Sequence, residues 1–181
     1  MSKIIFVTGG ARSGKSRFAE EYAKKISDSV CYLATAEALD EEMKERICHH
    51  QSRRPESWKT VEEPLEVHTA IQNLNGSAKV ILLDCLTLWM SNLIHQNSSG
   101  AECRAQDMLE ASFLKIKNSG QTLILISNEI GMGVIPDNPL SRQFADMSGR
   151  VNQFVSREAD EVYFLVSGIP MKVKGCENVK S

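Results

Sequence analysis

The sequence predicts a single three-layer α/β domain, with a mainly parallel sheet between two layers of helices. Short apolar runs of strand-forming residues alternate with longer segments of helical periodicity along the whole chain. These apolar runs are uninterrupted, as in parallel strands that are buried on both faces. The chain has 181 residues, of which 42% are hydrophobic. One core therefore accommodates residues 1–181, and no second domain is expected.

The first predicted strand, Ile4–Val7, leads through a glycine-rich turn into a helix over residues 16–26. The turn has the pattern Gly-x4-Gly-Lys-Ser, in which glycines let several backbone N–H groups converge on a polyphosphate at a helix N-terminus. A glycine turn that merely joins a strand to a helix is the alternative. Here the strand and the helix flank the motif in the order that a phosphate loop requires. The predicted phosphate-binding residues are Gly9, Gly10, Ala11, Arg12, Ser13, Gly14, Lys15 and Ser16.

Two side chains of this loop have distinct predicted roles. Lys15 is expected to reach the β- and γ-phosphates of a bound nucleotide. Ser16 is expected to bind Mg²⁺ through its hydroxyl. The loop alone therefore predicts a metal–nucleotide site without indicating the reaction.

The next elements continue the alternation of strands and helices. A strand over residues 30–34 ends at the turn 35–37, the end of a strand at which ligands bind in such sheets. A second helix begins with the acidic residues 40–42, and Pro55 stops it or the loop that follows. Its end carries the basic residues Arg46, His49, His50, Arg53 and Arg54.

The rest of the chain predicts four more strands and four more helices, followed by an edge hairpin. In order, these are a strand over 58–63, a helix from Pro64 to about Asn73, a strand over 80–84, helices over 86–95 and 101–117, a strand over 123–127, a helix from about Leu140 to Ala159 and a strand over 162–168. A turn at 168–170 then predicts a C-terminal hairpin that adds an antiparallel edge strand.

Asp84 follows four aliphatic residues at the end of a predicted strand. In phosphate-loop proteins an acid at this place orders Mg²⁺ directly or through water. The alternative is an exposed acid that caps the next turn. Because the chain also has a phosphate loop, the metal role is favoured, and the predicted metal ligands are Ser16 and Asp84.

Composition excludes several other classes of protein. The net charge of −2 and the lack of a polybasic run argue against general binding to nucleic acid or membrane surfaces. The five cysteines form no Cys-x-x-Cys pair, which argues against a zinc site or a disulfide framework. No secretory signal is found, and no apolar run approaches the length of a membrane span, so a cytoplasmic protein is expected.

The basic group at the end of the second helix allows two interpretations. In the first, these side chains only complement the helix dipole. Alternatively, His50 lies four residues from Arg46 and three from Arg53, so imidazole and guanidinium groups can share one helix face. Such a group could hold a triphosphate while a neutral imidazole attacks the α-phosphorus, which would split a nucleotidyl transfer into two steps.

Several motifs together resemble one enzyme family. They are residues 9–16 (GGARSGKS), 32–36 (YLATA), 40–43 (DEEM), Arg46-Ile47 with His50, Arg54-Pro55, Trp58, 83–89 (LDCLTLW), 127–133 (SNEIGMG), 149–153 (GRVNQ), 159–162 (ADEV) and 168–172 (GIPMK). In this order they resemble the bifunctional adenosylcobinamide kinase/adenosylcobinamide-phosphate guanylyltransferases of cobalamin assembly. The resemblance covers essentially the whole chain and implies a P-loop NTPase fold of the RecA-like type.

The resemblance implies two reactions and a set of partners. Adenosylcobinamide would be phosphorylated with ATP or GTP, and GMP from GTP would then be transferred onto adenosylcobinamide phosphate through a GMP–histidine intermediate, with Mg²⁺ as cofactor. The resemblance also suggests a homotrimer. Within the family pattern Arg-Ile-x-x-His the nucleophile falls on His50, although spacing alone leaves the neighbouring His49 open.

The resemblance also implies nucleotide contacts outside the phosphate loop. These fall on Ala34, Thr35, Ala36, Gln51, Ser52, Arg53, Arg54, Glu62 and Asp84. The chain departs from the common family pattern at residues 144–148, so no contact from that helix is carried over.

Two rival functions use part of the same evidence. A plain small-molecule or nucleotide kinase needs the phosphate loop and Asp84 but no histidine nucleophile. A GTP-driven switch needs a guanine-reading motif, and the sequence contains no Asn-Lys-x-Asp. Retention of GMP on the protein distinguishes the predicted enzyme from the plain kinase.

Overall fold

A seven-stranded sheet forms the centre of the part of the protein that the structure describes. The structure is a computed structural model, and it describes residues 2–37, 41–52 and 54–175. The strand order is β3-β2-β4-β5-β1-β6-β7, and only β7 is antiparallel to its neighbour. The strands are β1 (Lys3–Gly9), β2 (Val30–Ala34), β3 (Lys59–Glu62), β4 (Val80–Asp84), β5 (Thr122–Ile126), β6 (Glu161–Val166) and β7 (Ile169–Lys174). The predicted parallel sheet with an antiparallel edge hairpin is confirmed.

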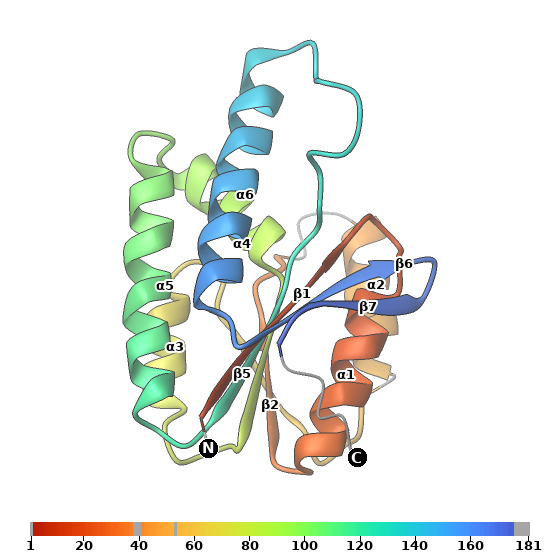
Figure 1. Ribbon diagram of the computed structural model, residues 1–181, viewed down its shortest axis with the longest axis vertical. Helices are drawn as coiled ribbons and strands as arrows, with labels where there is room; N and C mark the ends of the chain where they lie inside the picture. Colours follow the sequence, from red (N-terminus) through yellow and green to blue (C-terminus); the bar gives the residue numbers. More distant parts are fainter. Residues whose placement is uncertain (1, 38–40, 53, 176–181) are drawn as a thin grey trace.

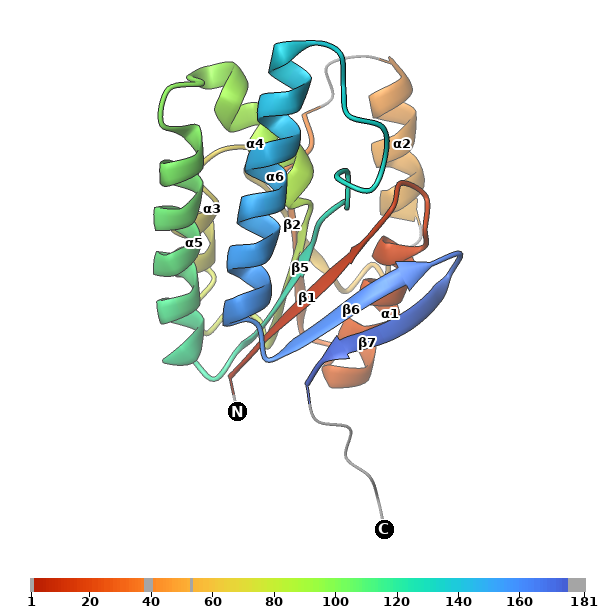
Figure 2. The same cartoon turned by 45° about the horizontal axis from the view of Figure 1, so that its top comes forward.

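Helices cover both faces of this sheet, as the sequence predicts (Figures 1 and 2). On one face lie α3 (Val67–Asn73), α4 (Leu86–Gln96), α5 (Ala101–Lys117) and α6 (Pro139–Glu158). On the other lie α1 (Lys15–Ile26) and α2 (Glu41–Ser52). No helix of the described ranges is both long and apolar enough to cross a membrane.

The core has two halves because successive side chains of a strand point to opposite faces. In β1, Ile4 and Phe6 pack under α5 and α6, whereas Ile5 and Val7 pack under α1. All four side chains are buried, and each contributes about 1.5–3 kcal/mol to folding relative to an exposed side chain. This double burial explains why the parallel strands are continuous apolar runs in the sequence.

Most predicted ends of helices and strands lie within two residues of the observed ends, and three differences concern the third helix, the strand before it and the C-terminal hairpin. The third helix begins at Val67 rather than Pro64, because the Glu63 carboxylate accepts the N–H groups of Leu65 at 3.0 Å and Glu66 at 2.8 Å in a turn before the helix. The strand predicted over 58–63 is shorter, Lys59–Glu62.

The third difference lies at the C-terminal hairpin. The strand β6 ends at Val166, before the predicted limit at residue 168. Ser167 and Gly168 have φ values of 50° and 85° and form a two-residue turn, the geometry that joins antiparallel strands tightly. The return strand β7 therefore begins at Ile169, inside the predicted turn.

Candidate active site

The phosphate loop joins β1 to α1 and requires glycine at two positions. Gly9 and Gly14 have φ values of 147° and 92°, which side chains other than glycine rarely adopt. A Cβ atom at Gly9 would lie 2.5 Å from the carbonyl oxygen of Leu165, and one at Gly14 would lie 3.2 Å from the Cα atom of Gly168. The loop is thus packed tightly against the β6–β7 hairpin.

This hairpin contact is a part of the site that sequence reasoning missed. The N–H group of Gly168 donates a hydrogen bond to the carbonyl oxygen of Ser13, with an N–O distance of 2.9 Å. On the other side of the loop, the N–H group of Glu129 donates to the carbonyl oxygen of Gly9, also at 2.9 Å. Backbone contacts between distant segments carry no residue-specific signal in a sequence. They fix the loop between the end of β5 and the hairpin.

Lys15 is the first residue of α1, and its side chain folds back into the phosphate loop. Its Nζ donates to the carbonyl oxygen of Gly10 at 2.6 Å and lies 3.5 Å from the hydroxyl of Ser13. Although it is charged, Lys15 is only 6% exposed. The loop therefore holds its ammonium group beside the backbone that the sequence predicts to bind phosphates.

Ser16 and Asp84 meet across the sheet, as their predicted shared role requires. The Ser16 hydroxyl donates to Oδ2 of Asp84 at an O–O distance of 2.9 Å. In the sheet, β5 lies between β1 and β4. The helix α1 starts at the end of β1 and packs over both β5 and β4, which brings Ser16 to Asp84. The first turn of α1 therefore lies at the carboxyl end of β4.

Tyr32 joins this pair and was not among the predicted site residues. Its hydroxyl donates to the same Oδ2 atom of Asp84 at 2.7 Å. Burial of the ring, and after it the negative charge of Asp84, raises the pKa of Tyr32 well above its ordinary value. The hydroxyl therefore stays protonated and acts as a donor. The available signal was the two-residue period of a strand, which places Tyr32 on the same face of β2 as Ala34.

The donor set at Ser16 and Asp84 fits Mg²⁺. This ion prefers oxygen ligands, and it is usually held by one or two protein oxygens together with water and substrate phosphates. The Ser16 hydroxyl, at the end of the phosphate loop, lies 2.9 Å from a carboxylate oxygen of Asp84. Within the described ranges no group of three or more His, Cys, Asp and Glu residues could hold a metal ion. A site completed by nucleotide phosphates is therefore the kind of metal site that these residues support.

The predicted nucleotide contacts after β2 lie along one edge of the sheet. Ala34 is the register partner of Glu62 on β3 and of Asp84 on β4. Thr35 is fully buried, and its hydroxyl donates to the carbonyl oxygen of Cys85 at 2.8 Å while accepting the N–H group of Cys85 at 2.9 Å. The Thr35 side chain therefore ties the ends of β2 and β4 together. Its backbone takes part as well, because its N–H group donates to the carbonyl oxygen of Asp84 at 3.2 Å and its carbonyl oxygen accepts from Nδ2 of Asn92 at 2.9 Å.

The predicted nucleophile lies on α2, which includes position 50. The side chains of Arg46, His49, His50 and Gln51, as well as the whole of Arg53, lie outside the described part of the structure. Ser52, the last residue of α2, is exposed.

Arg54 connects the end of α2 to the rest of the site. Its guanidinium carbon lies 3.2 Å from the centre of the Tyr32 ring. This stacked arrangement is a cation–π contact. Two guanidinium nitrogens of Arg54, Nε and Nη1, are buried and have no hydrogen-bond partner within the described ranges. Arg54 therefore places a positive charge directly against Tyr32, next to Asp84.

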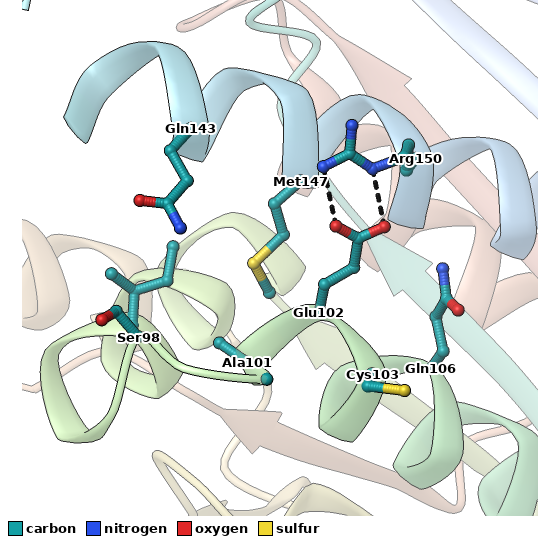
Figure 3. Close-up of a pocket in the computed structure, with 10 residues that line it drawn as sticks. Ser98, Ala101, Glu102, Cys103, Gln106, Gln143, Met147 and Arg150 are labelled. Atoms are coloured by element: carbon teal, nitrogen blue, oxygen red, sulfur yellow. Dashed lines mark hydrogen bonds and ion pairs between the residues drawn. The ribbon is translucent and has the colours of Figure 1, made fainter. Parts of the chain in front are cut away.

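A separate groove lies on the opposite face of the sheet from α1, between the start of α5 and α6 (Figure 3). Its cavity volume is about 380 Å³. Arg150 and Glu102 form a two-bond ion pair in it, with N–O distances of 2.6 and 2.7 Å. None of the predicted nucleotide-site residues lines this groove. The candidate active site is instead the open carboxyl edge of the sheet around the phosphate loop.

Comparisons with known proteins agree with these observations. Residues 5–173 match the family model described as cobinamide kinase / cobinamide phosphate guanyltransferase. The bifunctional adenosylcobalamin biosynthesis protein CobP of Pseudomonas aeruginosa is 40% identical over 169 residues, which cover 93% of this chain and 96% of that protein. The bifunctional adenosylcobalamin biosynthesis protein CobU of Escherichia coli is 40% identical over 183 aligned residues, and that of Salmonella typhimurium 39%; both alignments cover 94% of this chain and 99% of the relative.

A solved structure shows the fold independently of close sequence similarity. The crystal structure of the RadB recombinase is 14% identical, with a TM-score of 0.54, and the match covers 90% of this chain and 73% of that chain. At this identity the likeness concerns the fold alone, and the predicted RecA-like fold is confirmed.

Proposed function

The chain belongs to the cobinamide kinase / cobinamide phosphate guanyltransferase family. We propose here which of its residues take part in each of the two reactions. The protein is a bifunctional enzyme of adenosylcobalamin biosynthesis that phosphorylates cobinamide and guanylylates the resulting phosphate. We propose that both reactions use one nucleotide site at the carboxyl edge of the sheet. The observation that carries this proposal is the hydrogen bond of Ser16 to Asp84 beside the phosphate loop.

In the kinase reaction, the cobinamide hydroxyl attacks the γ-phosphorus of ATP or GTP and releases the nucleoside diphosphate. We infer that residues 9–16 hold the phosphates through backbone N–H groups and that Lys15 turns from the Gly10 carbonyl to the γ-phosphate. Ser16 and Asp84 would hold Mg²⁺. When bound, this ion would neutralise charge on the phosphate oxygens. The protein's own part is to position the nucleotide and offset its negative charge.

In the guanylyltransferase reaction, we propose that the His50 imidazole attacks the α-phosphorus of GTP and displaces pyrophosphate. A phosphate oxygen of cobinamide phosphate then attacks the same phosphorus and releases the imidazole, so the phosphorus–nitrogen bond that formed first is broken. The guanidinium group of Arg54 supports this division, because it brings positive charge from the end of α2 to the sheet edge. The family resemblance supports four more nucleotide contacts in this reaction, which we propose at Gln51, Ser52, Arg53 and Glu62.

The proposal is tested by the mass of the intact protein after incubation with GTP and Mg²⁺, where one added GMP is expected. His50→Ala should abolish this addition and retain part of the kinase activity, because only the transfer reaction needs the nucleophile. His49→Ala is the matched control and should still carry GMP. Lys15→Ala should lower both activities by about 100-fold, since it removes a cation from the shared phosphate site. Acid-labile label from α-labelled GTP persisting on the His50→Ala protein would contradict the assignment.

We further infer a homo-oligomer, for which the family resemblance suggests a trimer, and a cytoplasmic location. The loop before α6 and the first turn of α6 expose four large apolar side chains, a pattern that favours association with another surface. They are Met132, Val134, Ile135 and Leu140. The described cysteines, Cys31, Cys48, Cys85 and Cys103, are free thiols, as in a reducing compartment. Sedimentation of the full chain is expected to give a mass above that of one chain, and a monomer would overturn the oligomer.

A further inference from the structure

Tyr32 belongs to the motif 32–36, but neither the phosphate loop nor that motif assigns its side chain a role in the site. It lies in the middle of β2, is 3% exposed, and faces the half of the core that α1 covers. On the neighbouring strand its register partner is Leu82, two residues before Asp84. The long side chain therefore runs forward along the sheet, toward the carboxyl edge, and its hydroxyl reaches the Asp84 carboxylate at 2.7 Å.

The contact is specific to one carboxylate oxygen. Oδ2 of Asp84 accepts both the Tyr32 hydroxyl and the Ser16 hydroxyl. If Ser16 turns its oxygen to a metal ion, its own bond to Asp84 is given up, whereas the bond from Tyr32 does not depend on that change. Tyr32 is thus placed to keep the carboxylate oriented in both situations.

The ring of Tyr32 is itself held in place. The guanidinium group of Arg54 covers it at 3.2 Å from the ring centre, and the core under α1 surrounds it. A hydroxyl on a fixed ring is a better positioning group than one on a mobile side chain, because it loses little freedom when it orients its acceptor.

A second carboxylate on the same face offers a useful contrast. Glu161 also accepts tyrosine hydroxyls, from Tyr22 and Tyr163, each at 2.7 Å, but it forms ion pairs with Lys3 and Lys172 as well. Asp84 forms no ion pair with any residue in the described ranges. The charge of Glu161 is matched within the protein, whereas the charge of Asp84 is left for a bound cation.

We propose that Tyr32 is a positioning residue of the nucleotide site, whose hydroxyl orients the Asp84 carboxylate toward the nucleotide-bound metal ion. The inference rests on the proposed role of Asp84 at that metal. It assigns to Tyr32 no contact with the nucleotide or the ion. Tyr32 acts through Asp84, and loss of its hydroxyl is expected to lower the affinity of the site for the metal ion.

The test measures binding of Mn²⁺ to the full-length protein in the presence of a non-hydrolysable GTP analogue, with free Mn²⁺ detected by electron paramagnetic resonance. Tyr32→Phe, which keeps the ring, is expected to weaken Mn²⁺ binding on the order of 10-fold, as loss of a group that orients a metal ligand does. Affinity for the analogue without metal should be unchanged. Tyr163→Phe is the matched control, because it also deletes a hydroxyl bonded to a carboxylate, and it should leave Mn²⁺ binding as in the wild type.

Asp84→Asn separates the failure of this inference from that of the proposed function. If Asp84→Asn weakens Mn²⁺ binding and Tyr32→Phe does not, the positioning role is overturned while the metal role of Asp84 stands. If Asp84→Asn has no effect, the metal role fails and the inference fails with it. An equal loss in Tyr32→Phe and Tyr163→Phe would also overturn the inference, since it would show a general effect of removing a tyrosine hydroxyl bonded to a carboxylate.

Discussion

At the scale of single residues, Gly9 is restricted both by the phosphate-loop motif and by packing against a distant strand. Gly9 belongs to the motif that the sequence identifies, but its need for glycine comes from β6. An added Cβ atom would lie 2.5 Å from the backbone oxygen of Leu165, on a strand more than 150 residues away in the chain. Because that oxygen is part of the backbone, it cannot move aside as a flexible side chain would.

Gly9→Ala is therefore expected to lower the free energy of unfolding by about 1–3 kcal/mol, since it combines a strained φ of 147° with a backbone clash. Gly10→Ala is the matched control, because a Cβ atom there meets nothing within 4 Å and its φ is not in the left-handed region. Urea unfolding of both variants measures the difference. Equal losses at the two positions would show that the contact with β6 does not restrict Gly9.

At the scale of elements, the parts of the fold that the sequence predicts best are those with a strong local pattern. The strands Val30–Ala34 and Val80–Asp84 have the predicted limits, because short apolar runs with polar neighbours leave little choice of boundary. The predicted start of α3 at Pro64 was wrong, because residues 63–66 form a turn in which the Glu63 carboxylate accepts the N–H groups of Leu65 and Glu66. Apolar periodicity does not reveal such a local contact between a side chain and the backbone.

In the candidate site, too, residues with a local sequence signal were predicted, and contacts without one were missed. Ser16 and Asp84 were predicted as a pair, because each lies at a recognisable place after a strand, and they meet at 2.9 Å. Tyr32 was placed in a strand and in the motif 32–36 but was given no role in the site, since nothing local distinguishes a core tyrosine from one whose hydroxyl reaches a site residue. The contact between the β6–β7 turn and the phosphate loop was also missed, because it is made by backbone atoms that any sequence supplies.

At the scale of the whole molecule, one buried carboxylate joins segments from both ends of the chain. Glu161 begins β6 and contacts Lys3 of β1, Tyr22 of α1 and Lys172 of β7. Its side chain is only 9% exposed, so these interactions are poorly screened by solvent. The network connects β1, the strand that precedes the phosphate loop, to the β6–β7 hairpin. The same hairpin packs on that loop.

The charge of Glu161 makes this network sensitive to acid. Burial alone would raise the pKa of Glu161, but hydrogen bonds from Lys3, Tyr22 and Tyr163 outweigh it and lower the pKa to about 2, compared with an ordinary value of 4.5. A carboxylate whose pKa is lowered by folding stabilises the folded state above its unfolded pKa, and that contribution is lost as the pH falls toward the folded pKa. For Glu161 the loss runs from about pH 4.5 to about pH 2.

Glu161→Gln should therefore cost more stability near neutral pH than in acid. We expect the difference in unfolding free energy between wild type and variant to be largest at about pH 6 and to shrink at about pH 3, because the wild type alone takes up this proton on unfolding. Glu158→Gln is the control. Lys117 also lowers the pKa of Glu158, but that side chain is 39% exposed, so solvent screens the pair and the variant should differ little from wild type at either pH. Urea unfolding at both pH values measures the four differences. A cost of Glu161→Gln that is the same at the two pH values would mean that the network holds the hairpin by packing and not by the charge of Glu161.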